Sequence, residues 1–342
     1  MDAAPEKVVA EALAELRALH KHISSKKDLL RHAETLVQRH PWLHVHQALR
    51  YILLLGREEA EELFSTRAKD IMRTIRVNTL ITSSDHVARR LSAKGFRVKK
   101  HPFIDYGLVV EYAPFSPGAA QEYLQGLYTI QGPASMMAVP AMEPANGDRI
   151  ADACSGAGVK TTQIAQHAPE SSILAFDANR RKLAALKNNA SRLAVDNIIA
   201  YHEDARNLSH YGPFDKILLD APCSGEGLIP FPRGRWPRSF NDIVDRARLQ
   251  LELALAAARA LRSGGTLLYS TCTMSVEENE FIAAKLIEHA GLEPHPPHLP
   301  GSSPGVEEYA NLDLRRAVKA CRRYYPHRHG TEGFTICRLR KP

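Results

Sequence analysis

Residues 149–177 read RIADACSGAGVKTTQIAQHAPESSILAFD, and this stretch indicates the fold most clearly. An apolar strand is followed by a glycine-bearing turn, a helix at about Lys160–His167 and a second strand that ends in Asp177. Such a β-α-β unit joins two parallel strands through a helix. The alternation continues with strands at 198–203, 215–221 and 265–271 and helices at about 180–193, 241–261 and 276–290. The pattern predicts a doubly wound, Rossmann-like α/β sheet, whose ligands bind at the carboxyl ends of the strands.

Two smaller units precede this sheet. Leucines at helical spacing, with Pro41 and Gly56 as breaks, predict a helical N-terminal segment over residues 1–70. A strand, a helix ending at Gly95 and two further strands then predict a small α/β subdomain over residues 71–135, similar to an RNA-recognition (RRM-like) fold. The Rossmann-like domain occupies residues 136–342.

Composition excludes several classes of protein. The chain has 342 residues, with 44% hydrophobic and 24% charged residues, which is typical of a globular protein in water. It contains no apolar run of 18 residues, so we expect no membrane span, and its first residues lack the layout of a secretory signal. The five cysteines are an odd number and include no CxxC pair. This argues against a disulfide framework and a structural zinc site, and it favours a reducing cytoplasm. Cys154, Cys321 and Cys337 are expected to be small buried hydrophobes.

The charge distribution points towards a polyanionic partner. Lys+Arg 45 minus Asp+Glu 38 gives a net charge of +7, and residues 315–341 carry nine basic residues against one acid. Basic residues that alternate with aromatic ones suit a phosphate backbone and stacked bases, although a solvated basic surface explains charge alone equally well. The candidate RNA contacts are Arg233, Arg235, Trp236, Arg238, Arg322 and Arg323. Tyr324 and Tyr325 are candidate stacking surfaces, with packing under a loop as the alternative.

Acidic residues at successive strand ends suggest a nucleoside-containing cofactor. The turn at Gly156 and Gly158 lets backbone N–H groups approach a ligand closely. Asp177 follows Gly156 by 21 residues, the spacing that suits a ribose diol, and Asp204 after the third strand could accept from an adenine amino group. These features alone leave NAD and S-adenosylmethionine as alternatives.

Two cysteines lie at the ends of the fourth and fifth strands. Asp220 is followed after three residues by Cys223, and the fifth strand ends at Thr271–Cys272. Ser275–Glu278 has a capping-box pattern, which predicts a helix whose positive end would stabilise a thiolate at Cys272. Neighbouring strand ends are expected to bring Cys223 and Cys272 to opposite sides of one pocket. A disulfide between them is an alternative that a reducing compartment argues against.

From about Arg76 to its end, the chain resembles the RNA cytosine-5 methyltransferases of the Sun/Fmu type. The pair DAPCSG and STC, in this order, is the most specific part of the resemblance. The anchors are RVNTLITS at 76–83, QGPAS at 131–135, DACSGAGVKT at 152–161, FDANRRKL at 176–183, ED at 203–204, DAPCSGEG at 220–227, STC at 270–272 and EGFTICRLRK at 332–341.

The resemblance implies a role for each strand end. S-adenosylmethionine would be cradled by Cys154, Ser155, Gly156, Ala157, Gly158, Val159 and Lys160. Asp177, with Lys182 nearby, would hold the ribose, Asp204 the adenine, and Asp220 would lie between the cofactor and the base. Cys272 would be the nucleophile and Cys223 would help release the product. For the chemistry, Lys160 and a protonated Asp220 would polarise the pyrimidine.

The chain departs from the family pattern in its cofactor loop. Ala157 stands where the family usually has Pro, and Val159 where it has a second Gly. A β-branched residue disfavours positive φ, so the loop is expected to differ in shape, with an effect on cofactor affinity. Lys182 replaces the usual Arg after the ribose-binding acid.

The implied activity is methyl transfer to carbon 5 of a cytosine in tRNA or rRNA by a cytoplasmic monomer without a metal. One alternative is a non-catalytic RNA-binding or assembly factor on the same scaffold. Others are a methyltransferase that acts on another nucleic-acid position and a nicotinamide-dependent oxidoreductase. The Asp220–Cys223 sequence, DAPC, differs from the Asn/Asp-Pro-Pro-aromatic signature of amino methylation, and the Glu-Asn-Val that follows the nucleophile of DNA cytosine-5 enzymes is absent.

Overall fold

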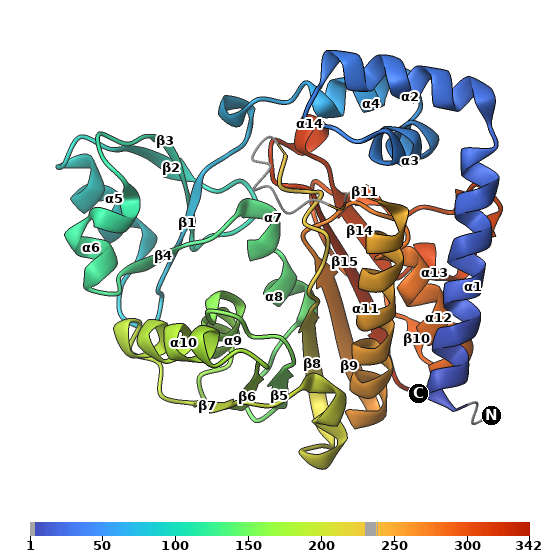
Figure 1. Cartoon of the computed structure of the whole chain (residues 1–342). Helices are drawn as coiled ribbons and strands as arrows, with labels where there is room; N and C mark the ends of the chain where they lie inside the picture. Colours follow the sequence, from blue (N-terminus) through green and yellow to red (C-terminus); the bar gives the residue numbers. More distant parts are fainter. Residues whose placement is uncertain (1–3, 230–236, 238) are drawn as a thin grey trace.

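The structure, a computed structural model, describes residues 4–229, 237 and 239–342 (Figure 1). A helical N-terminal segment, a small four-stranded sheet and a large nine-stranded sheet follow one another along the chain. Within the described residues, none of the helices combines the length and apolar character that a membrane crossing needs.

The N-terminal segment is helical, as the leucine spacing predicts. Its helices are α1 (Pro5–Ser24), α2 (Lys27–Arg39), α3 (Val45–Leu55) and α4 (Arg57–Phe64), and the short η1 (Ala68–Asp70) follows. Leu16 and Leu19 of α1 are fully buried and share one hydrophobic core with Leu251 and Ala254 of helix α11 (Phe240–Ala260) in the Rossmann-like domain. The segment therefore packs on the large domain and has no separate core.

The small subdomain has the β-α-β-β-α-β order of a ferredoxin-like or RRM-like fold. Its sheet has the antiparallel order β2-β3-β1-β4, and Ile75, Leu108 and Tyr128 pack beneath its helices. Arg76 lies on the other face and donates hydrogen bonds to the Val159 carbonyl and to Thr162, which joins the subdomain to the cofactor loop. The elements are β1 (Thr74–Val77), α5 (Ser84–Ser92), β2 (Arg97–Lys100), β3 (Gly107–Tyr112), η2 (Pro117–Ala119), α6 (Gln121–Leu124) and β4 (Tyr128–Ile130).

The large sheet is doubly wound, as predicted. Its order is β11-β14-β15-β9-β8-β5-β6-β7, with β10 beside β15, and β9 through β7 run parallel. The strand order reverses between β5 and β8, which is where such sheets bind ligands. The strands are β5 (Arg149–Asp152), β6 (Ser172–Phe176), β7 (Ile198–Tyr201), β8 (Phe214–Asp220), β9 (Leu261–Thr271), β10 (Glu293–Pro294), β11 (Ser303–Pro304), β14 (Cys321–Tyr324) and β15 (Phe334–Arg340); β12 (Glu308–Tyr309) and β13 (Leu312–Asp313) form a separate pair.

Helices cover both faces of this sheet. Leu218 of β8 packs towards the short helix α8, whereas Ile217 and Leu219 pack towards α11, because successive side chains of a strand point to opposite faces. The remaining helices are α7 (Pro133–Met136), α8 (Ala138–Met142), α9 (Val159–His167), α10 (Arg180–Arg192), η3 (Ala205–His210), α12 (Glu280–Ala290), α13 (Arg315–Val318) and α14 (Pro326–His329). The predicted helix at 276–290 therefore begins four residues late.

The capping-box prediction at Ser275–Glu278 is wrong. Helix α12 follows Asn279, whose side chain makes no capping hydrogen bond. Ser275 Oγ instead donates to Glu277, and the Glu278 carboxylate accepts from Ser224 N and Gln250. Hydrogen bonds to distant segments thus override the local capping pattern, and no helix begins directly after Cys272.

The expectation that Cys321 and Cys337 are unpaired buried hydrophobes is also wrong. These residues lie directly opposite each other in the antiparallel β14–β15 pair and form a disulfide. The sequence spacing could not reveal this pairing, because it depends on the register of two strands. Cys154, Cys223 and Cys272 are free.

We predict that alkylation of the denatured, unreduced protein modifies three cysteines, and that reduction raises this number to five. Intact-mass measurement after treatment with iodoacetamide counts the modified thiols. Five modified cysteines without reduction would contradict the disulfide, whereas one would indicate that Cys223 and Cys272 had also oxidised.

Candidate active site

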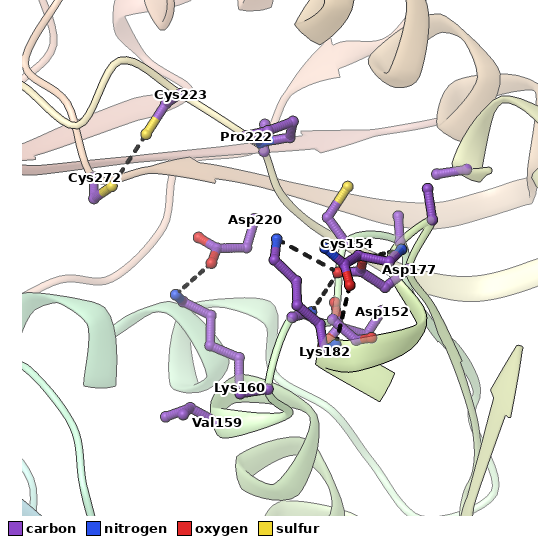
Figure 2. Close-up of a pocket in the computed structure, with 18 of the residues that line it drawn as sticks. Asp152, Cys154, Val159, Lys160, Asp177, Lys182, Asp220, Pro222, Cys223 and Cys272 are labelled. Atoms are coloured by element: carbon purple, nitrogen blue, oxygen red, sulfur yellow. Dashed lines mark hydrogen bonds and ion pairs between the residues drawn. The ribbon is translucent and has the colours of Figure 1, made fainter. Parts of the chain in front are cut away.

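The carboxyl ends of β5, β6, β8 and β9 surround a cavity of about 790 Å³. This volume lies within the usual range for a pocket that holds a small-molecule ligand. Nearly all of the residues predicted to bind cofactor or catalyse the reaction line this cavity (Figure 2). They are Cys154, Ser155, Gly156, Ala157, Val159, Lys160, Asp177, Lys182, Asp204, Asp220, Cys223 and Cys272.

The shape of the cofactor loop depends on two glycines. Gly156 and Gly158 have φ of +56° and +81°, a region that L side chains rarely adopt. A Cβ added at Gly158 would also lie 2.7 Å from Leu186 Cγ. Val159 is the first residue of α9, and positive φ is confined to other positions of the loop. The valine in place of a family glycine therefore causes no backbone strain here.

The predicted ribose-binding acid closes this loop. Asp177 follows β6, is 8% exposed, and accepts hydrogen bonds from Gly156 N at 2.9 Å and Asn179 N at 2.8 Å. Lys182 Nζ lies 3.9 Å from the same carboxylate. The second acid, Asp204, follows β7 and pairs with Arg206, whose hydrogen bond lowers the pKa of this carboxyl. Both acids stand where the strand-end argument predicts.

Lys160 and Asp220 form an ion pair on the wall of the cavity (Figure 2). Lys160 Nζ lies 2.7 Å from Asp220 Oδ2, and Ser270 Oγ donates to Asp220 Oδ1 at 2.9 Å. Burial alone would lower the pKa of Lys160, but the adjacent Asp220 carboxylate outweighs it and raises that pKa. The ammonium group therefore stays charged inside the cavity.

The two cysteine sulfurs are neighbours in the same cavity. Cys223 Sγ and Cys272 Sγ are 3.1 Å apart, so the prediction of a shared pocket is confirmed, but the prediction of opposite sides is wrong. Their loops are tied together by hydrogen bonds from Gly227 N to the Cys272 carbonyl and from Ser224 Oγ to Thr273 Oγ1. The hydrogen bond to Cys272, together with burial, raises the pKa of Cys223 well above its usual value. In its protonated form Cys223 can donate a hydrogen bond to the Cys272 sulfur.

The prediction that Arg323 contacts RNA is wrong. Its side chain is fully buried and donates to Glu280 and to the Met274 carbonyl, so it neutralises an internal carboxylate. Tyr324 and Tyr325 are 2% and 3% exposed, which excludes them as stacking surfaces in this structure. Arg322 is half-buried and stays a candidate. Arg233, Arg235, Trp236 and Arg238 lie outside the described residues.

Asp152 also belongs to the site, although no role was predicted for it from the sequence. Asp152 is 1% exposed and accepts from Thr161 Oγ1 at 2.7 Å, while its Oδ1 atom has no hydrogen-bond partner within the described part of the chain. Burial raises the pKa of this carboxyl to about 7. Its position at the end of the first quoted strand was the signal that could have identified it.

Comparison with known proteins assigns both domains. The family described as 16S rRNA methyltransferase RsmB/F matches residues 139–340, and the ferredoxin-like domain of RsmF/B-like methyltransferases matches residues 50–114. Similar curated proteins include the human 28S rRNA (cytosine(4447)-C(5))-methyltransferase, 36% identical over 78% of this chain, and ribosomal RNA small subunit methyltransferase F of Escherichia coli O157:H7, 34% identical over 82%. The alignments span only 34% and 59% of those two relatives.

Two solved structures from Pyrococcus horikoshii are similar to most of this chain. One, described as a methyltransferase homolog protein, has a TM-score of 0.80 and 33% identity and covers 93% of this chain and 100% of its own. The other, NSun6 with SFG, has a TM-score of 0.75 and 27% identity and covers 85% of this chain and 96% of its own.

We predict that Asp152→Asn becomes more stable relative to the wild type as pH rises. The folded carboxyl has a pKa of about 7 against 3.8 for an ordinary Asp, so the wild-type fold loses stability as pH rises from about 4 to 7. The difference in free energy of unfolding should grow by about 3 kcal/mol between pH 5 and pH 8. Urea unfolding at several pH values measures it. Asp196→Asn, at an exposed position, controls for loss of one carboxylate, and a difference independent of pH would contradict the prediction.

Proposed function

The chain belongs to the RsmB/F methyltransferase family, and from this premise we propose that it methylates carbon 5 of a cytosine in ribosomal RNA, with S-adenosylmethionine as methyl donor. The relatives in man and Escherichia coli carry names that describe methylation of ribosomal RNA. The observation that carries the proposal is the pair of cysteine sulfurs, 3.1 Å apart, in the cavity that Asp177 and Lys160 also line. A carbon-5 methylation needs both a nucleophile and a group that manages protons, and the pair can supply both.

S-adenosylmethionine fits the donor set of the cavity. Gly156 has no atom within 4 Å of the place where a Cβ would lie, which leaves its backbone open to a ligand. Asp177 would hold the ribose hydroxyls and Asp204 the adenine, while the unpartnered Asp152 Oδ1 could accept from the ligand's ammonium group. The homologous NSun6 structure contains SFG, an analogue of this cofactor. When bound, the cofactor supplies an electrophilic methyl group.

Cys272 acts as the nucleophile in this proposal. Carbon 5 of cytosine is weakly nucleophilic. The Cys272 thiol would lose its proton to water as its sulfur bonds to carbon 6, and this bond makes carbon 5 enamine-like and able to take up the methyl group. Because burial and the contact with Cys272 raise the pKa of Cys223, its thiol would donate the hydrogen bond and the Cys272 sulfur would be the attacking atom. Lys160 and Asp220 would stabilise charge that develops on the pyrimidine ring, since both lie on the cavity wall.

Product release is assigned to Cys223. After methyl transfer, carbon 5 must lose its proton before the bond between Cys272 and carbon 6 can break. A base that Cys223 positions would take this proton, or Cys223 itself after its own thiol proton has passed to water, since its sulfur lies 3.1 Å from that of Cys272. The target base must be unpaired or flipped out to reach the cavity. Arg322 and the basic residues at 233–238 remain candidates for the RNA backbone.

We predict that Cys272→Ala abolishes methyl transfer, whereas Cys223→Ala forms a covalent protein–RNA adduct that it cannot resolve. The first variant lacks the nucleophile, and the second retains it but lacks the proton acceptor. Denaturing gels with radiolabelled ribosomal RNA detect the adduct, and nucleoside mass spectrometry detects 5-methylcytidine.

Each variant is first shown to bind S-adenosylmethionine by calorimetry, which controls for folding. Full turnover by Cys272→Ala would refute the assignment of the nucleophile. An adduct with Cys272→Ala but not with Cys223→Ala would exchange the two roles.

We predict that Asp177→Asn weakens binding of S-adenosylmethionine by about 10- to 100-fold, because hydrogen bonds to a charged acceptor contribute about 1.5–3 kcal/mol. Thermal unfolding with increasing ligand concentration measures the affinity. Asp196→Asn, at an exposed position remote from the cavity lining, serves as the matched control. Stabilisation of the wild type by NAD in place of S-adenosylmethionine would instead support an oxidoreductase.

A further inference from the structure

Arg50 crosses from the N-terminal helical segment into the catalytic domain. It lies on α3 and its side chain is only 3% exposed. All three nitrogens of its guanidinium group donate, and together they make five hydrogen-bond contacts between 2.7 and 3.1 Å. Nε and Nη2 contact Glu277, Nη2 also contacts Ser275, and Nη1 contacts both carboxylate oxygens of Glu226.

The partners of Arg50 belong to the two loops that carry the active-site cysteines. Glu226 follows Cys223 by three residues, and Glu277 follows Cys272 by five. One planar guanidinium group therefore holds the far end of both loops in a fixed relation. A lysine ammonium is a point charge and could not reproduce this fork.

The rest of the same helical face supports the contact. Gln47 and Tyr51, which lie one turn apart on the side of α3 that carries Arg50, donate to Glu226 at 2.9 and 3.1 Å. Tyr309 of β12 also contacts Glu277, to which its Oη donates at 3.3 Å. Glu226 thus accepts only from α3 among the side-chain contacts that the described residues show, so the position of the Cys223 loop depends on the N-terminal segment.

Arg50 also balances a concentration of buried negative charge. Glu226, Glu277 and Glu278 are at most 1% exposed. Burial would raise the pKa of Glu277, but Arg50 outweighs it and lowers this pKa to about 2. The pKa of Glu278 is raised to about 7 by burial and by the Glu226 charge. Loss of the guanidinium would leave the Glu226 and Glu277 carboxylates to repel one another across the two loops.

We propose that Arg50 is a positioning residue that sets the distance between the Cys223 and Cys272 sulfurs. The N-terminal helical segment is then part of the active-site frame. The effect of Arg50 on methyl transfer rests on the proposed function, whereas its effect on the distance between the two sulfurs can be measured without RNA.

The effective concentration of one thiol near the other reports this geometry. Equilibration with oxidised and reduced dithiothreitol forms a Cys223–Cys272 disulfide, with two thiol hydrogens transferred to the oxidised reagent, which is reduced. Peptide mapping by mass spectrometry measures the equilibrium constant. We expect Arg50→Lys to lower it at least fivefold. Glu15→Gln removes the 2.7 Å ion pair to Lys285, another contact of the helical segment with the catalytic domain, and should leave the constant within twofold of the wild type.

Glu226→Gln is the second variant, since it keeps the side-chain shape and the Arg50–Glu277 contact but weakens the hold on the Cys223 loop. It should lower the same constant, by a smaller factor than Arg50→Lys. The proposal would be overturned if Glu226→Gln and any folded Arg50→Lys protein had the wild-type equilibrium constant for the Cys223–Cys272 disulfide. A fall equally large in Glu15→Gln would also overturn it, because it would show general loosening of the domain.

Methylation assays then separate the two hypotheses. With kcat expressed per S-adenosylmethionine-binding site, Arg50→Lys should reduce kcat at least tenfold with an unchanged KM for S-adenosylmethionine, because Arg50 does not line the cofactor cavity. An altered disulfide constant in a protein whose wild type methylates no cytosine would refute the proposed function and leave the positioning role intact. Normal kcat despite an altered constant would show that catalysis does not need this spacing, which would overturn the consequence for methyl transfer.

Discussion

The parallel pairing of β8 with β9 brings the candidate catalytic side chains of this protein together. In their register Asp220 lies opposite Ser270, so the residues that follow each strand emerge side by side at one edge of the sheet. Cys223 and Cys272 then meet at 3.1 Å, and Asp220 lies between them and Lys160 (Figure 2). If the register slipped by one residue, the side chains at the two strand ends would point to opposite faces of the sheet, and Cys223 would be separated from Cys272. The cofactor loop after β5 completes the same edge.

Bringing so many polar groups to a buried edge requires counter-charges, and these come from distant parts of the chain. Arg50 arrives from the N-terminal helices, and Arg323 from the antiparallel extension of the sheet, where it neutralises Glu280. Isolated buried charges are strongly unfavourable, whereas fully hydrogen-bonded pairs can be accommodated. The N-terminal segment and the last strands therefore contribute to the same framework as the cysteine loops, although none of their described residues lines the cavity.

The parts of this arrangement that depend on local sequence could be predicted. Apolar runs, the glycine turn and acids at strand ends gave the sheet, the cofactor loop and the positions of Asp177 and Asp204. Features set by pairing across long distances could not be predicted. The Cys321–Cys337 disulfide depends on the β14–β15 register. Arg323 was predicted to be exposed from the local excess of basic residues, because its partner Glu280 lies 43 residues away. The Ser275 capping pattern failed for the same reason, since Arg50 and Glu277 occupy its side chain.

The most direct test of the two-sulfur mechanism uses the wild-type protein and ribosomal RNA in which cytidine is replaced by 5-fluorocytidine. Fluorine cannot leave carbon 5 as the proton does, so the account predicts that S-adenosylmethionine-dependent methylation stops at a stable adduct. Mass spectrometry of the tryptic peptides should then find a methylated, fluorinated nucleotide on Cys272. Methylation of this RNA without an adduct, or an adduct on Cys223, would contradict the account.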